Sequence, residues 1–181
     1  MLNHPTKIWG TFLACLFLVA CHKAPTLDNA MALKLLAPYY ESSGYTVSIA
    51  TNNPQARGKK PTGWNCTDKK SLVSSGLALC KESGRSGVYL KFTDEGKKLL
   101  VGSWGDNTLR YARVIAVLQQ IEEIQSIELI DPTHAIINYT WVYHQHTPFS
   151  NPQLEKTIAL NVPQMAQASV VLNNKEWTII R

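Results

Sequence analysis

Two histidines separated by one residue, His144 and His146, are the side chains whose type and spacing best suit metal chemistry. On an extended strand, residues i and i+2 project from the same face about 6.6 Å apart, as a chelating pair does. Zinc needs a third protein ligand, and His134 cannot supply it because the intervening extended chain spans roughly 33 Å. We therefore interpret His144 and His146 as surface histidines near the end of a strand, and we expect neither a metal nor a cofactor. A metal site at this pair is the alternative.

Sequence motifs of hydrolytic catalysis are absent. The chain contains no Gly-x-Ser-x-Gly, no His-Glu-x-x-His and no glycine-rich phosphate loop. Glu122 and Glu123 are adjacent, so on a strand they point to opposite faces, and on a helix they lie roughly 100° apart. Neither geometry suits an acid and base pair. These observations favour a protein that is not an enzyme.

The N-terminal segment has the pattern of an export signal. Lys7 precedes an apolar run from Ile8 to Ala20, which is shorter than the roughly 20 residues of a membrane-spanning helix. The end of this run, Leu18-Val19-Ala20-Cys21, resembles the lipobox of bacterial lipoproteins. The resemblance implies removal of residues 1–20 and attachment of acyl chains such as palmitate to Cys21. His22 follows in place of Asp, which in enterobacterial lipoproteins implies sorting to the outer membrane, facing the periplasm.

Two cysteines remain beyond the signal and the lipid site. Cys66 and Cys80 are separated by 14 residues, which disfavours a redox Cys-x-x-Cys pair. In an oxidising compartment they are expected to form a disulfide. Closing such a loop stabilises a fold by roughly 3 kcal/mol in the chain-entropy model.

Charge is distributed unevenly along the chain. Residues 22–113 hold 14 Lys and Arg against 7 Asp and Glu, whereas residues 114–181 hold 3 against 6. The first half therefore suits contact with an anionic partner: lipid, lipopolysaccharide, peptidoglycan or an acidic protein face. Nucleic acid is not expected at a periplasmic address. A solvated basic surface without a partner is the alternative.

A loop over residues 51–65 and one tryptophan are the candidate binding residues. The loop contains Pro, Gly and Asn, which favour turns, and it carries Arg57, Lys59 and Lys60 beside Trp64. Such a long loop is functional or simply mobile and solvated. Trp104 lies between glycines in a turn-like context and is the second candidate contact. Trp141 and Trp177 follow strand alternation and are expected in the core.

The first half of the chain predicts helices and short strands. Residues 28–37 form a helix capped by Asp28 or Thr26 and ended or kinked by Pro38. Further elements are a strand over 45–50, a helix over 67–81 with Thr67 as its N-cap, and a strand over 87–92. Residues 72–100 also resemble the helix-then-wing segment of winged-helix proteins. The resemblance implies a local shape only, because the basic recognition helix of DNA-binding members is not evident.

The second half predicts strands. Residues 109–129 form a long, bulged strand, with a helix over 112–124 as the rival, and a turn follows over 131–134. Residues 135–144 alternate strictly, with the odd positions facing the core. Residues 167–180 form a hairpin with Asn173 and Asn174 at its turn.

The expected fold class is α+β, with a helix-rich N-terminal half packed on a C-terminal antiparallel meander and one disulfide. After the tether, 21–27, residues 28–181 form a single domain with a possible sub-boundary near 103–108. Similar element orders occur in cystatin-like and nuclear-transport-factor-like folds, which is a likeness of architecture alone.

The function expected from the sequence is a non-catalytic, protein-binding component of envelope or secretion-system assembly. It is anchored in the outer membrane by lipid, and its oligomeric state is open. One alternative is an immunity protein or inhibitor that neutralises a secreted toxin. A metal-dependent wall enzyme centred on His144 and His146, and direct lipid or glycan binding through Arg57, Lys59 and Lys60, are the others.

Overall fold

The structure is a computed structural model that describes residues 25–41, 43–84, 87–106 and 108–180. The signal sequence, the lipobox and Cys21 lie outside the described residues. In the part of the chain that is described, no helix is long and apolar enough to cross a membrane.

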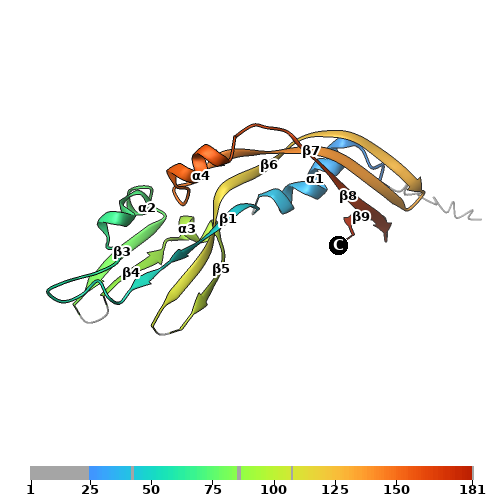
Figure 1. Cartoon of the computed structure of the whole chain (residues 1–181). Coiled ribbons are helices and arrows are strands. Elements are labelled where there is room, and N and C mark those ends of the chain that lie inside the picture. Colours follow the sequence, from blue (N-terminus) through green and yellow to red (C-terminus); the bar gives the residue numbers. More distant parts are fainter. Residues whose placement is uncertain (1–24, 42, 85–86, 107, 181) are drawn as a thin grey trace, which may run out of the picture.

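Antiparallel strands dominate the fold, so the expected α+β class with a helix-rich N-terminal half is wrong: the described chain is mostly β (Figure 1). The described helices are short: α1 (Asn29–Tyr40), α2 (Lys70–Ser74), α3 (Asp94–Lys98), α4 (Pro152–Thr157) and the 3-10 turn η1 (Thr67–Lys69). The strands of the first half are β1 (Gly44–Ala50), β2 (Asn52–Asn53), β3 (Ala78–Ser83), β4 (Gly87–Phe92) and β5 (Leu100–Gly105). Those of the second half are β6 (Arg110–Asp131), β7 (His134–His146), β8 (Gln164–Asn173) and β9 (Glu176–Ile179).

The larger sheet has the order β1-β6-β7-β8-β9, and β5 pairs with the beginning of β6. Strands β6 to β9 follow one another as an antiparallel meander. The first residues of β6 therefore lie between β1 and β5, whereas its later residues pair with β7. The sheet curls along its length, with α1 beneath it (Figure 1).

A smaller sheet, β2-β4-β3, forms one end of the molecule. The expected helix over 67–81 is wrong beyond Ser74, because Gly76 takes a positive φ of 74° and Ala78 to Ser83 pair with β4. Residues 72–100, the segment that resembles a winged helix, contain the end of α2, the paired strands β3 and β4, and α3. The short helix α3 follows β4 directly and is capped by the hydroxyl of Thr93.

The long strand expected over 109–129 is confirmed as β6, which leaves the rival helix without support. Its pairing with β7 shifts at four places, three of which insert an extra residue into β6 and one of which inserts His144 into β7. The alternation expected for β7 holds only in part. Ala135, Ile137 and Tyr139 are buried, but Thr140 and Val142 are buried as well, because this part of β7 is covered on both faces.

The buried side chains form two clusters joined by β6. One contains Val114 together with Leu72 of α2, Ala78 of β3 and Leu90 of β4. The other contains Ile124 and residues of α1, β7, β8 and β9. Helix α1 packs Ala32 and Leu36 into the second cluster. Its end differs from expectation, because the helix passes Pro38 and continues to Tyr40.

The β8–β9 hairpin turns one residue later than expected. Asn173 pairs with Glu176, so the turn residues are Asn174 and Lys175, both at positive φ. The prediction of Asn173 and Asn174 at the turn is therefore right for Asn174 and wrong for Asn173, which is the last residue of β8. In this turn Lys175 adopts the left-handed conformation at φ 68°.

Candidate functional site

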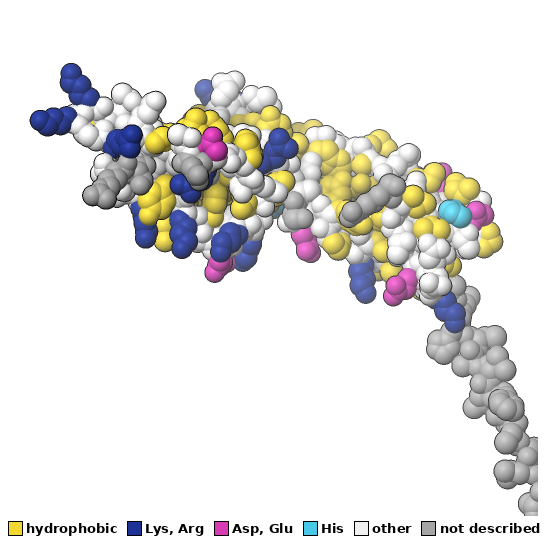
Figure 2. Space-filling model, turned by 90° about the horizontal axis from the view of Figure 1, so that it is seen from below, with side chains coloured by type: hydrophobic (Ala, Val, Ile, Leu, Met, Phe, Trp, Pro, Cys, Tyr) yellow, Lys and Arg dark blue, Asp and Glu magenta, His cyan; other side chains and the backbone are white. Residues whose placement is uncertain are grey.

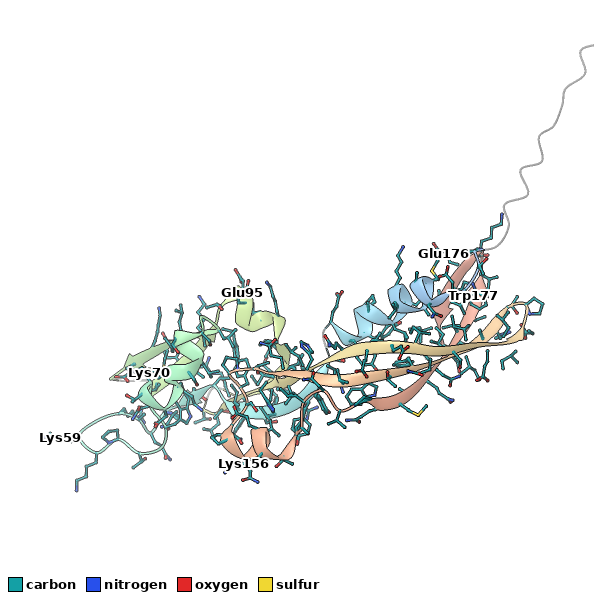
Figure 3. The ribbon with its side chains drawn as sticks, turned by 90° about the horizontal axis from the view of Figure 1, so that it is seen from above. Lys59, Lys70, Glu95, Lys156, Glu176 and Trp177 are labelled. Carbon is teal, nitrogen blue, oxygen red and sulfur yellow. A yellow bond between two sulfur atoms is a disulfide. The ribbon has the colours of Figure 1, made fainter. Side chains whose placement is uncertain are left out.

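The candidate binding surface lies at the end of the molecule opposite the first described residue. At the other end, where the described chain begins, the indole N–H of Trp177 donates to the carbonyl of Pro25 at 3.0 Å. Trp177 and Lys59 lie at opposite ends of the elongated fold (Figure 3). We call the described residues of 51–111 the distal lobe, and residues 54–65 within it the distal loop.

The backbone of the distal loop is held in place by hydrogen bonds from one buried side chain. Asn53 is 7% exposed, and its Nδ2 donates to the carbonyls of Thr62 and Trp64, both at 2.7 Å. Its Oδ1 accepts from the backbone N–H of Gln55 at 3.1 Å. Gly63, at φ 77°, lies against this amide, where a Cβ would collide with it. The interpretation of 51–65 as a freely mobile loop is therefore not supported.

Asn52, the preceding residue, fixes a second loop of the distal lobe. It is 5% exposed; its Nδ2 donates to the carbonyl of Thr108 at 2.9 Å, and its Oδ1 accepts from the N–H of Arg110 at 2.7 Å. These bonds hold the connection between β5 and β6. Buried amides that satisfy backbone groups in this way make loops rigid.

The end of the distal loop is fixed by the expected disulfide. Cys66 and Cys80 are bonded, which joins the loop to β3. Thr67 is not the expected N-cap, because it lies inside η1, whose N-cap residue is Cys66. The side chain of Asn65 accepts from the N–H of Thr67 at 2.8 Å. The Lys69 ammonium lies 5.2 Å from the centre of the Trp64 ring, and Trp64 is half-buried against the first cluster.

The basic side chains predicted as contacts are brought together on this loop. Arg57, Lys59 and Lys60 are exposed, and residues 51–65 include no Asp or Glu. Neither Lys59 nor Lys60 forms an ion pair with a described residue, whereas Lys97 and Lys98 pair with Asp94 and Glu95 on α3. Lys and Arg gather over the left part of the molecule in Figure 2, which contains the distal lobe.

Trp104 lies on strand β5, not in the turn expected from its flanking glycines. It remains 48% exposed and stacks on Tyr111 across the β5–β6 pair, with ring centres 5.7 Å apart and an interplanar angle of 16°. Trp177 is in the core as expected, and Trp141 is half-buried beside the second cluster.

The histidine pair is not brought into one site. His144 is the extra residue of the β7 bulge and lines a cavity of about 380 Å³ beside α1. His146 contacts Ser150 Oγ at 3.0 Å and the carbonyl of Ile158 at 3.2 Å. The bulge breaks the i, i+2 geometry that a chelating pair requires. Among the described residues, no three His, Cys, Asp or Glu side chains group as a metal site.

Another polar pair lies inside the fold, away from the distal lobe. The hydroxyl of Tyr40 donates to that of Tyr139 at 3.1 Å, and their rings meet edge to face. Burial, with a smaller contribution from this hydrogen bond, raises the pKa of Tyr40 well above its ordinary range. A phenol with a raised pKa stays protonated, which suits a structural bond rather than acid and base chemistry.

Asn52 and Asn53 are the important residues that sequence reasoning missed. In the sequence they look like ordinary turn-favouring residues, because their burial depends on the pairing of β2 with β4. No protein-family model matches the chain, and neither a curated protein nor a solved structure shows significant similarity to it.

Proposed function

We propose that the protein is a non-catalytic binding component of the bacterial envelope, anchored by lipid at Cys21, whose distal loop contacts an acidic face of a partner protein. One observation carries the proposal: the rigid basic loop lies at the far end of the molecule from Pro25, where the chain approaches its proposed anchor (Figure 3). An anchored protein of this shape presents Lys59 and Lys60 away from the membrane.

Charge and order both support a binding role for the distal loop. Lysines without an ion pair keep their full attraction for an anionic partner, and complementary charge accelerates encounter and selects partners. A loop whose backbone is already fixed loses less conformational entropy on binding. The disulfide agrees with an oxidising compartment such as the periplasm.

The test is crosslinking in cells that produce the full-length protein, followed by identification of the captured proteins. We expect several envelope proteins to be captured. The double change Lys59→Glu and Lys60→Glu should abolish their capture. Lys34→Glu with Lys156→Glu makes the same change in net charge elsewhere on the surface and should leave capture intact. Capture that survives the Lys59 and Lys60 changes contradicts the proposal.

The same experiment separates assembly from inhibition. A stoichiometric complex with one secreted toxin, and with no other envelope protein, would reassign the protein as an immunity protein. Membrane association is tested separately: Cys21→Ser should release the protein from membranes, and unchanged association would contradict the anchor.

A further inference from the structure

A second surface of the distal lobe has the properties of a binding cleft. It has a volume of about 470 Å³ and lies where the β5–β6 hairpin meets β4. The residues that line it include Phe92, Ser103, Trp104, Asp106, Arg110 and Tyr111. Aromatic and charged residues therefore meet in one open site, which neither the distal loop nor its lysines contribute to.

The aromatic part of the cleft offers a flat, accessible surface. Trp104 and Tyr111 are nearly parallel, and nearly half of the Trp104 side chain is exposed. An aromatic face carries partial negative charge. The C–H groups on one face of a sugar ring carry partial positive charge and lie flat against such a surface.

The charged part of the cleft offers directional hydrogen bonding. Arg110 is exposed and forms no ion pair with a described residue, so its guanidinium is available to a carboxylate or phosphate. Asp106 is already oriented: its Oδ1 accepts from the N–H groups of Thr108 and Leu109 at 2.6 and 2.9 Å. These bonds lower the pKa of Asp106, so it is a carboxylate that can accept from sugar hydroxyls.

The frame of the cleft is rigid. Asn52 holds the hairpin from beneath through Thr108 and Arg110, and Gly105 makes the close approach to Leu109 that a Cβ would prevent. Such a frame fixes the aromatic pair relative to the carboxylate and the guanidinium. Fixed geometry of this kind favours a ligand with several ring hydroxyls over a flexible apolar chain.

We propose that this cleft binds an acidic saccharide, with a sugar ring stacked on Trp104 and its carboxylate or phosphate held by Arg110. The site goes beyond the proposed protein-binding function and does not depend on it. The acidic group has two possible sources in an envelope, the carboxylated sugar of wall glycan and the phosphorylated sugar of a glycolipid.

The experiment is calorimetric titration of the full-length protein with three disaccharides. These are N-acetylglucosaminyl-N-acetylmuramic acid, a bisphosphorylated glucosamine disaccharide, and uncharged chitobiose. We expect one of the two acidic probes to bind at least about tenfold more tightly than chitobiose, and the tighter of the two identifies the source. No binding of either acidic probe up to about 10 mM would overturn the proposal.

Variants assign the binding to this cleft. Trp104→Ala should weaken binding by about tenfold or more, and Trp104→Tyr should restore most of it. Arg110→Gln should lower the affinity for the acidic probe by about tenfold but change the affinity for chitobiose by less than about twofold. Leu109→Ala, on the same hairpin but outside the cleft lining, is the matched control.

A purely structural role of the aromatic pair predicts different results. In that case Trp104→Ala lowers the melting temperature while saccharide affinity, measured well below that temperature, stays at the wild-type value. That outcome would overturn the proposal. The Lys59→Glu, Lys60→Glu variant should lose the captured proteins but bind the saccharide with wild-type affinity. The two proposals can therefore fail separately.

Discussion

Asn52 and Asn53 are neighbours on the two-residue strand β2, yet their buried amides hold two different loops. Asn52 fixes the β5–β6 connection, and Asn53 fixes the distal loop. Successive residues of a strand point to opposite sides, so a single short strand can support both loops at once.

Removing the Asn53 amide should loosen the distal loop selectively. Asn53→Ala leaves the carbonyls of Thr62 and Trp64 without their donor, at a cost of about 1–3 kcal/mol. We expect faster amide exchange at Gln55 and Thr62 and a lower urea midpoint. Asn52→Ala is the reciprocal control: it should speed exchange at Arg110 and spare the distal loop. Equal effects of both variants on both loops would contradict this division.

Removing the disulfide should destabilise the protein by about 3 kcal/mol. The expectation follows from the 14-residue separation of Cys66 and Cys80, because the bond restricts the unfolded chain. Urea unfolding of the Cys66→Ala, Cys80→Ala double variant measures it. Adding a reductant should lower the midpoint of the wild type and leave the double variant unchanged. An equal response of both proteins would show that the bond contributes nothing.

The indole N–H of Trp177 should tie the start of the described chain to the fold. Trp177→Phe removes the hydrogen bond to the Pro25 carbonyl and should lower the free energy of unfolding by about 1 kcal/mol. Trp177→Ala also leaves a cavity in the second cluster and should lower it by about 3–5 kcal/mol. Thermal unfolding separates the two. If Phe and Ala destabilise equally, packing is not the larger part of the contribution.

The turn between β6 and β7 should respond to acid. Asp131 accepts from the N–H groups of Thr133 and His134, and the Thr133 bond is the main reason that its pKa is lowered from 3.8 to about 2. A lowered carboxyl pKa stabilises the fold above the unfolded value, and this contribution disappears as the pH falls through about 2. Carboxyl NMR should therefore report a midpoint near pH 2.

The Asp131 turn has a simple control. Asp131→Ala should speed amide exchange at Thr133 and His134 at neutral pH, because both N–H groups lose their acceptor, and the carboxyl signal with its midpoint near pH 2 should be absent from its NMR spectrum. A wild-type midpoint near the ordinary 3.8 would mean that these bonds are not maintained in solution.

The sequence predicted best where the pattern was long and local. Period-two alternation identified β7, and the richness in Ile and Val correctly favoured strand over helix for β6. The disulfide followed from counting cysteines after assigning an export signal. Each of these inferences needed only residue type and spacing.

Prediction was poorest where distant partners decide the structure. A helix over 67–81 was predicted from Thr67 as a cap and from the apolar contacts of Leu72, Leu77 and Leu79. However, β4 pairs with Ala78 to Ser83 and makes that segment a strand. The burial of Asn52 and Asn53 likewise depends on β4. For the candidate site, the basic loop and Trp104 were named from the sequence, whereas the rigid frame beneath them could not be.

Strand β6 also determines how the molecule would carry tension. Its 22 residues correspond to about 70 Å of extended chain and take part in both hydrophobic clusters. The covalent path from Pro25 to the distal lobe runs through α1 and β1, and β1 is paired along its length with the first half of β6. A pull between these two ends is therefore passed from β1 to β6 through their hydrogen bonds, and β6 spreads it over both clusters.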